Sequence, residues 1–405
     1  EEFAKNEYRS YILIDFAEAP LDIQELFSDT SNLDYIFLQL QLRYSVQLFE
    51  RESLIIFDEV QLCPSARQAI KQLVKDGRYD YIETGSLISI RKNIAHILIP
   101  SEEQRIQMRP MDYEEFLWAQ GDESTFPLLE QTFTSETALG EQLNRKLMRD
   151  FRLYMLVGGM PQAVDAYLQT NNLQVVDETK RMIIDLYEED FYKISPSGVL
   201  SLLFDAIPAQ LAKKSSRYHV SSVLSKRQAS DILEEIAELR ESKTVLVAYH
   251  VDDPNVGMSS SIDLEKFKLY MADTGLFVLL AFKDSDFTEN TIYEKLLSDK
   301  LPVNLGAVYE NVVAQELVAH GHKLFYHTWV KDKANRNYEI DFITSAGKKI
   351  CPIEVKSSGY KTHASLDEFS KKFSSRIGKQ FLVYTKDIKK DNSIICLPTY
   401  MSYFL

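Results

Sequence analysis

Two adjacent acids, Asp58 and Glu59, directly follow the apolar run at 54–57. A short apolar run is typical of a strand buried on both faces, and acids at its carboxyl end lie where open parallel sheets bind ligands. One carboxylate can hold Mg²⁺ through water while the other polarises an attacking water. The pair therefore predicts metal-assisted phosphoryl transfer, with Asp58 at the metal and Glu59 at the water. The alternative is that both acids cap a helix that begins after the strand.

A second strand predicted at 79–82 delivers Thr84 and Ser86, small hydroxyl side chains that could sense a γ-phosphate. Together with 54–59, which looks like a Walker B motif, they make half of an ATP site. The other half is missing, because no G-x-x-x-x-G-K-[ST] occurs in the printed residues. We expect the phosphate-binding loop, and the start of the helix in which Glu1 lies, upstream of the printed sequence.

A second group of acids lies near the C-terminus. Asp341 lies on one predicted strand, and Glu354 and Lys356 follow on the next, where alternation puts both on one face. Two carboxylates and a lysine converging across a hairpin resemble the PD-(D/E)XK nuclease core. Asp341 and Glu354 would then be Mg²⁺ ligands, Lys356 would orient or activate water, and Glu310 matches a helical glutamate that many such nucleases add. The alternative is a salt-bridged, solvated hairpin.

The elements that must position these residues follow from apolar spacing. Strands predicted at 11–16, 54–57, 79–82 and 105–108 alternate with helices, which indicates a parallel α/β sheet. From 112 to 194 the pattern is helical, beginning with a cap at Asp112. After a linker at 195–198, helices at 204–211, 221–224 and 229–241 and strands at 244–249 and 267–271 follow the winged-helix order. Strands at 324–327, 339–344, 350–355, 380–384 and 394–397, with a helix at 366–373, predict a small mixed-sheet domain.

Composition limits the partners. The 405 residues include 46 Lys and Arg against 60 Asp and Glu, a formal charge of −14, which disfavours bulk electrostatic binding of nucleic acid. Any DNA contact needs a local basic patch, for which the candidates are Lys356, Lys361, Lys371, Lys372, Arg376 and Lys379. Three scattered cysteines indicate neither disulfides nor a zinc site and fit a cytoplasmic setting. No apolar run approaches the 18 or more residues of a membrane span.

Five segments together resemble the prokaryotic AAA-superfamily ATPases that carry a C-terminal PD-(D/E)XK-type domain. They are IIFDEVQ at 55–61, ETGS at 83–86, PMDYEEFL at 110–117, GGMP at 158–161 and YMADTGL at 270–276. The resemblance implies an α/β multidomain protein that uses ATP and Mg²⁺. Its parts would be an incomplete P-loop NTPase core at 1–110, a helical subdomain at 111–195, a winged helix at 196–282 and a mixed-sheet, restriction-endonuclease-like domain at 283–405.

Three hypotheses stay open at this point. The leading one is an ATPase whose nucleotide state controls the winged helix and the nuclease-like module. The others are a nucleotide-regulated binding scaffold without catalysis at its C-terminal acids, and primarily a Mg²⁺-dependent DNA nuclease. The third predicted helix of the winged helix is acidic, with Glu234, Glu235, Glu238 and Glu241, so packing against protein is favoured over insertion into DNA. A protein partner or a homo-oligomer is compatible with each hypothesis.

Overall fold

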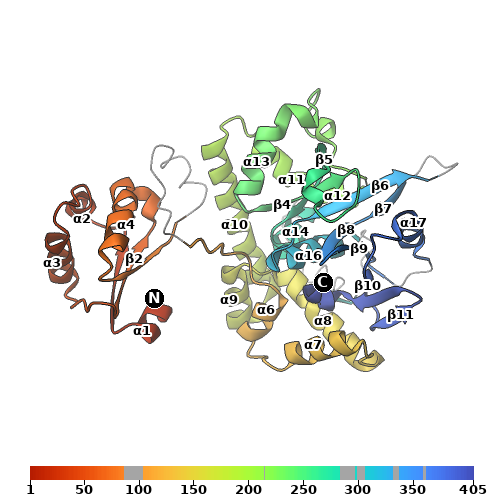
Figure 1. Ribbon diagram of the computed structural model, residues 1–405, viewed down its shortest axis with the longest axis horizontal. Coiled ribbons are helices and arrows are strands. Elements are labelled where there is room, and N and C mark those ends of the chain that lie inside the picture. The colour runs from red at the N-terminus through yellow and green to blue at the C-terminus, as the bar shows by residue number, and fades with distance from the viewer. Residues whose placement is uncertain (86–103, 214, 283–296, 299–305, 332–336, 359–361) are drawn as a thin grey trace. The chain divides into compact units, whose positions relative to one another are not determined.

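The chain folds into two compact units, Glu1–Gln107 and Met108–Leu405, in the computed structural model (Figure 1). The structure describes residues 1–85, 104–213, 215–282, 297–298, 306–331, 337–358 and 362–405. The predicted domain boundaries at 195/196 and 282/283 both fall inside the second unit. They stay predictions.

The first unit is built on a parallel sheet of three strands in the order β1-β2-β3, as the alternating pattern predicts. The strands are β1 (Ser10–Asp15), β2 (Ser53–Asp58) and β3 (Asp80–Glu83), and the helices are α1 (Glu2–Glu7), α2 (Leu21–Leu26), α3 (Leu33–Tyr44) and α4 (Pro64–Asp76). The central strand β2 is buried along most of its length, because it has a neighbour on each side. Phe57 of β2 packs edge-to-face against Phe16 and Phe27, with ring centroids 5.5 and 5.1 Å away.

The strand predicted at 105–108 is wrong. These residues pair with no strand among those described, and Ile106 and Met108 are 79% and 85% exposed. A strand forms when its backbone groups bond to a neighbour and its apolar face is covered, and here the alternating residues meet neither condition. The segment instead has no regular secondary structure, and the boundary between the two units falls within it.

Helices make up the first part of the second unit, as the sequence predicts for 112–194. They are α6 (Tyr113–Ala119), α7 (Thr125–Ser135), α8 (Glu141–Val157), α9 (Pro161–Thr170) and α10 (Leu173–Ile194). The predicted cap is present: Asp112 Oδ1 accepts the Glu115 N–H at 2.9 Å, and Glu115 Oε2 accepts the Asp112 N–H at 3.1 Å. No helix in the described part of the chain is long and apolar enough to cross a bilayer.

The helices that follow are shorter than predicted. They are α11 (Val199–Asp205), α12 (Ile207–Ala212), the 3₁₀ turns η2 (Val220–Ser222), η3 (Ala229–Ile232) and η4 (Met258–Ser260), and α13 (Leu233–Glu241). The helix expected at 221–224 is thus only a single 3₁₀ turn.

A four-stranded sheet crosses the predicted boundary at 282/283. Its order is β5-β4-β6-β7, with β4 (Val245–Val251), β5 (Ile262–Met271), β6 (Phe325–Val330) and β7 (Asn337–Ile340). β4 pairs antiparallel with β5 and parallel with β6, where Tyr249 lies beside Phe325. The two strands that the sequence assigns to a winged helix therefore share one sheet with strands assigned to the nuclease-like region.

A second sheet of the same unit has five strands in the order β11-β12-β10-β9-β8. They are β8 (Phe342–Ala346), β9 (Lys349–Val355), β10 (Gln380–Tyr384), β11 (Lys389–Asp391) and β12 (Ile394–Pro398), with α17 (Ala364–Phe373) between β9 and β10 and the 3₁₀ segment η5 (Thr399–Phe404) at the end. Asp341 falls between β7 and β8, so the single strand predicted around it is two strands that belong to different sheets.

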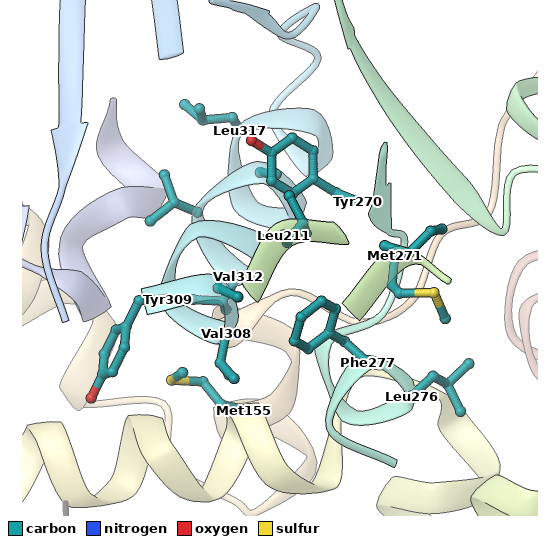
Figure 2. Packing of buried hydrophobic residues seen from close by; sticks show 14 of the residues in the cluster. Met155, Leu211, Tyr270, Met271, Leu276, Phe277, Val308, Tyr309, Val312 and Leu317 are labelled. Atoms are coloured by element: carbon teal, nitrogen blue, oxygen red, sulfur yellow. The ribbon is translucent and has the colours of Figure 1, made fainter. Parts of the chain in front are cut away.

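The core of the second unit surrounds α16 (Gly306–Ala319), which is buried at most of its positions. Apolar side chains from α8 and from α14 (Thr274–Ala281) pack against it. Figure 2 shows Met155 of α8 and Phe277 of α14 converging on Val308 of α16. A helix covered on nearly every face is placed by packing, so residues on it are held firmly.

Two glycines of the quoted motifs let three segments approach closely. The Met111 N–H donates to Gly159 O at 2.7 Å, and a Cβ on Gly159 would lie 2.0 Å from Met111 O. A Cβ on Gly275 would lie 2.5 Å from Val157 O. Asp273 joins the contact by accepting the Gly159 N–H at 2.6 Å. The motifs at 158–161 and 270–276 thus form one junction, which holds the segment that enters the second unit.

Substituting Gly159→Ala tests this junction. The new methyl group meets a backbone oxygen that cannot rotate away, so we expect a loss of more than roughly 3 kcal/mol of unfolding free energy, the upper end for overpacking. Gly321→Ala is the control: its Cβ meets open space, and its φ of +83° alone predicts about 1–2 kcal/mol. Urea unfolding of both variants compares the two losses. An equal loss would contradict the close contact.

Candidate functional site

The first candidate site lies at the carboxyl ends of β2 and β3. The Thr84 hydroxyl donates to Asp58 Oδ1, and the Glu59 N–H donates to the same oxygen at 3.2 Å. The strands enforce this meeting, because the Thr84 N–H donates to Phe57 O at 2.8 Å and so continues their pairing. Asp58 and Thr84, predicted separately, are therefore neighbours. Ser86 lies outside the described residues.

Glu59 occupies a sharp turn after the strand. Its φ of +50° is in the left-handed region, which is uncommon for a residue other than glycine. The Gln61 side-chain amide donates to Glu59 Oε2, which fixes the direction of that carboxylate. Asp15, beside Asp58 in the register of β1 and β2, adds a third acid at this edge that the sequence reasoning did not select. Its position directly after an apolar run was the available signal.

The second candidate site gathers three acids in the second unit. Glu310 of α16, Glu339 of β7 and Asp341 each offer a carboxylate oxygen, and these oxygens lie within 4.8 Å of one another. Asp341 reaches the cluster because it stands where the chain changes sheets. Hard oxygen donors are the ligands that Mg²⁺ prefers, so the donor set fits a divalent cation.

A buried lysine lies among these acids. Lys268 Nζ of β5 is 2.9 Å from Glu310 Oε1 and 2.6 Å from Glu339 Oε1, and the Tyr270 hydroxyl donates to the same Glu310 oxygen. Burial opposes a charged lysine, but the carboxylates, Glu310 first, raise the pKa of Lys268 well above its usual value. Burial and the neighbouring Glu310 also raise the pKa of Asp341. The lysine thus supplies positive charge that two of the three acids share.

Glu354 and Lys356 form a pair at the end of β9. Lys356 Nζ lies 2.5 Å from Glu354 Oε1, whereas Glu354 Oε2 is buried and has no hydrogen-bond partner among the described residues. Burial lowers the pKa of Lys356, but Glu354 and then Asp341 outweigh it, so the pKa is raised. The Val355 N–H donates to Asp341 Oδ2 at 2.7 Å, which joins this strand end to the acid cluster. Asp341 is thus tied to both groups.

The structure brings the four predicted residues of this site to one region but adds three that were missed. Glu339, Lys268 and Tyr270 were not selected from the sequence. Glu339 could have been found, because it precedes Asp341 by two positions in a strand pattern and so faces the same way. Lys268 carried a weaker signal, a lysine inside an otherwise apolar strand segment.

The predicted basic patch is largely neutralised. Lys371 pairs with Glu368, Lys379 with Glu136 and Arg376 with Asp253. The Lys372 ammonium lies 5.8 Å from the centre of the Trp329 ring. Lys361 lies outside the described residues. Because four of its charges, Lys356 with Glu354 included, have acidic partners, the patch offers less attraction to phosphate than its sequence suggests.

A further buried acid, Glu316, lies on α16 beside the segment that enters the second unit. It is fully buried, and the Tyr154 hydroxyl lies 2.9 Å from both Glu316 Oε1 and Met111 O. Burial raises the pKa of Glu316 to about 8, with the nearby Asp112 adding to the shift. Glu316 is therefore mostly protonated in the folded protein at neutral pH, whereas in the unfolded chain it is ionised.

This difference predicts a pH dependence of stability. A folded-state pKa above the unfolded value means that Glu316 contributes stability at pH below about 4.5, which is lost as the pH rises through about 8. Glu316→Gln removes the titration, so we expect its unfolding free energy relative to wild type to rise between pH 5 and pH 9. Urea unfolding at several pH values measures this, with the exposed Glu234→Gln as control. A pH-independent difference would exclude the raised pKa.

Comparison with known proteins assigns families to three segments. Residues 1–117 match an AAA domain, residues 148–286 match a domain of unknown function, DUF8612, and residues 305–400 match another, DUF4143. The first match confirms the prediction of an AAA-type, P-loop ATPase-like domain at the N-terminus, and such domains bind nucleotide, usually with Mg²⁺.

Comparisons with whole proteins add little to these matches. No curated protein matches the chain. Among solved structures, the crystal structure of protein VC1899 from Vibrio cholerae aligns over 98% of this chain and 95% of its own at 12% identity, with a TM-score of 0.19, too low to relate the two folds.

Proposed function

We propose that this protein is an ATPase that couples its nucleotide state to a nuclease-like module acting on DNA. The observation that carries the first half is the meeting of Asp58 and Thr84 at the carboxyl ends of adjacent parallel strands, within a segment that matches an AAA domain. The second half is supported by the acids and lysines gathered around Glu310 and Asp341. The two sites lie in different units of the chain.

In the ATPase proposal each residue at the edge of the sheet has a role. Asp58 would hold Mg²⁺ through water, and Mg²⁺ supplies charge that stabilises the phosphates of ATP. Glu59 would orient and polarise the attacking water, which suits a carboxylate whose direction is fixed by Gln61. Thr84, hydrogen-bonded to Asp58, would respond to the γ-phosphate.

The substitution Glu59→Gln tests these roles. Loss of the carboxylate that polarises water should lower ATP turnover by about a hundredfold or more while ATP still binds. Phosphate release and nucleotide affinity are the two measurements. Glu50→Gln, an exposed acid that precedes β2, is the matched control and should leave turnover unchanged. Normal turnover by the Glu59→Gln protein would refute the role.

The nuclease-like proposal uses the residues of the second unit. Glu310, Asp341 and Glu354 would hold Mg²⁺, which would polarise a scissile phosphate, and Lys356 would orient the attacking water. The buried, unpartnered Glu354 Oε2 supports the proposal, because an orphan carboxylate oxygen is expected to find a ligand. The winged-helix-like segment around β4 and β5 would contribute by packing against protein, since α13 is acidic.

A DNA-cleavage assay with Glu354→Gln tests the nuclease-like site. If Glu354 holds the catalytic metal, the variant should lose about a hundredfold or more of the Mg²⁺-dependent cleavage of single strands, duplexes or junctions. Glu265→Gln, exposed on β5, is the control for charge alone. Cleavage that survives in the Glu354→Gln protein would contradict the assignment.

One observation favours an alternative without cleavage. Lys268 already pairs with Glu310 and Glu339, so these two acids have a cationic partner within the protein itself. In that case the second unit would be a nucleotide-regulated scaffold that binds a protein partner or a second copy of the chain. A wild-type protein that cleaves none of the DNA forms above would favour this function.

A further inference from the structure

Lys268 is buried, whereas the nearby Lys266 on the same strand is partly exposed. It projects from β5 into the second unit and is 4% exposed, while its ammonium contacts Glu310 and Glu339. Two positions earlier on the same strand, Lys266 is partly exposed and pairs with Asp263 at 2.8 Å. A buried lysine is costly unless its charge is compensated. For Lys268 the compensating charges come from the acid cluster.

The Lys268 ammonium and a divalent cation would need the same oxygens. The ammonium lies 2.9 and 2.6 Å from one oxygen each of Glu310 and Glu339. These two acids and Asp341 form a group whose carboxylate oxygens lie within 4.8 Å of one another, close enough to hold a cation. A metal ion bound there would take up lone pairs that Lys268 now uses and would place two positive charges beside the ammonium.

We infer that Lys268 is a built-in counter-ion that competes with divalent cations for Glu310 and Glu339, so that the strand β5 sets the cation affinity of the site. The inference rests on the proposed function of this site as a cation site. The proposed ligands and the lysine that competes for them also lie in segments that match different families. The acids Glu339 and Asp341 lie within the DUF4143 match, whereas Lys268 lies within the DUF8612 match.

A purely structural role for Lys268 makes the opposite prediction. If the lysine only holds the acids in place, its removal would let them repel one another and move apart, and cation affinity would fall. If it competes, its removal leaves a cluster of acids whose charge the protein no longer balances, and cation affinity rises. The sign of the change therefore decides between the two roles.

Calorimetric titration of the full chain with Mg²⁺ measures whether replacing Lys268 raises or lowers the cation affinity. All proteins carry Asp58→Asn, so that the first unit does not contribute through that acid. We expect Lys268→Met and Lys268→Gln to bind Mg²⁺ at least about tenfold more tightly than the parent, because the competing charge is gone. Lys268→Arg keeps the charge and should stay near the parent, as should Lys266→Met, which is the matched control on the same strand.

Two further steps keep the result interpretable. Adding Glu339→Gln to Lys268→Gln should abolish the gain in Mg²⁺ affinity, which would show that the gain arises at the acid cluster. Lys268→Gln retains hydrogen bonding to the acids, so it tests the charge even if the Met variant unfolds. Equal or weaker Mg²⁺ binding by Lys268→Gln than by a parent that binds would overturn the competition but leave the cation site in place. Absence of binding in every protein would refute both the inference and the proposed cation site.

Discussion

The structure of the second unit depends on one constraint: α16 is buried on nearly every face, so each of its polar side chains must find a partner inside the protein. Asn311 accepts the Met271 N–H at 2.8 Å, and Gln315 accepts the Thr274 N–H at the same distance. These bonds attach the end of β5 and the start of α14 to the helix. Glu310, the residue before Asn311, meets Lys268 of β5 as a consequence of the same attachment.

Charge balance follows from that arrangement. Glu310, Glu339 and Asp341 are close enough to repel one another, and burial raises the pKa of the latter two. Lys268 relieves part of this repulsion. The same geometry that makes the cluster suitable for a cation therefore also supplies a cation of the protein's own. In the proposed nuclease-like function the acids hold a divalent cation, whereas in the scaffold without catalysis they hold the Lys268 ammonium.

Local patterns predicted much of the fold because their signals are short in sequence. The parallel strands of the first unit, the capping box at Asp112 and the helices from α6 to α10 each depend on residues within a few positions of one another. The failure at 105–108 shows the limit of this reasoning. Alternation of polar and apolar residues describes a strand only if another strand is there to pair with it, and for this segment none is present among the residues that the structure describes.

The sequence by itself determined that acids would stand at particular strand ends and that Glu310, Asp341, Glu354 and Lys356 would be candidates for one site. Only the tertiary structure decided that Lys268 joins them. It lies 42 positions from Glu310 and 71 from Glu339. The contact with Glu310 exists because β5 packs beside α16, and the contact with Glu339 exists because the sheet that contains β5 continues through β4 and β6 to β7. No periodicity encodes such a meeting, since it depends on how separate elements pack rather than on spacing within one of them.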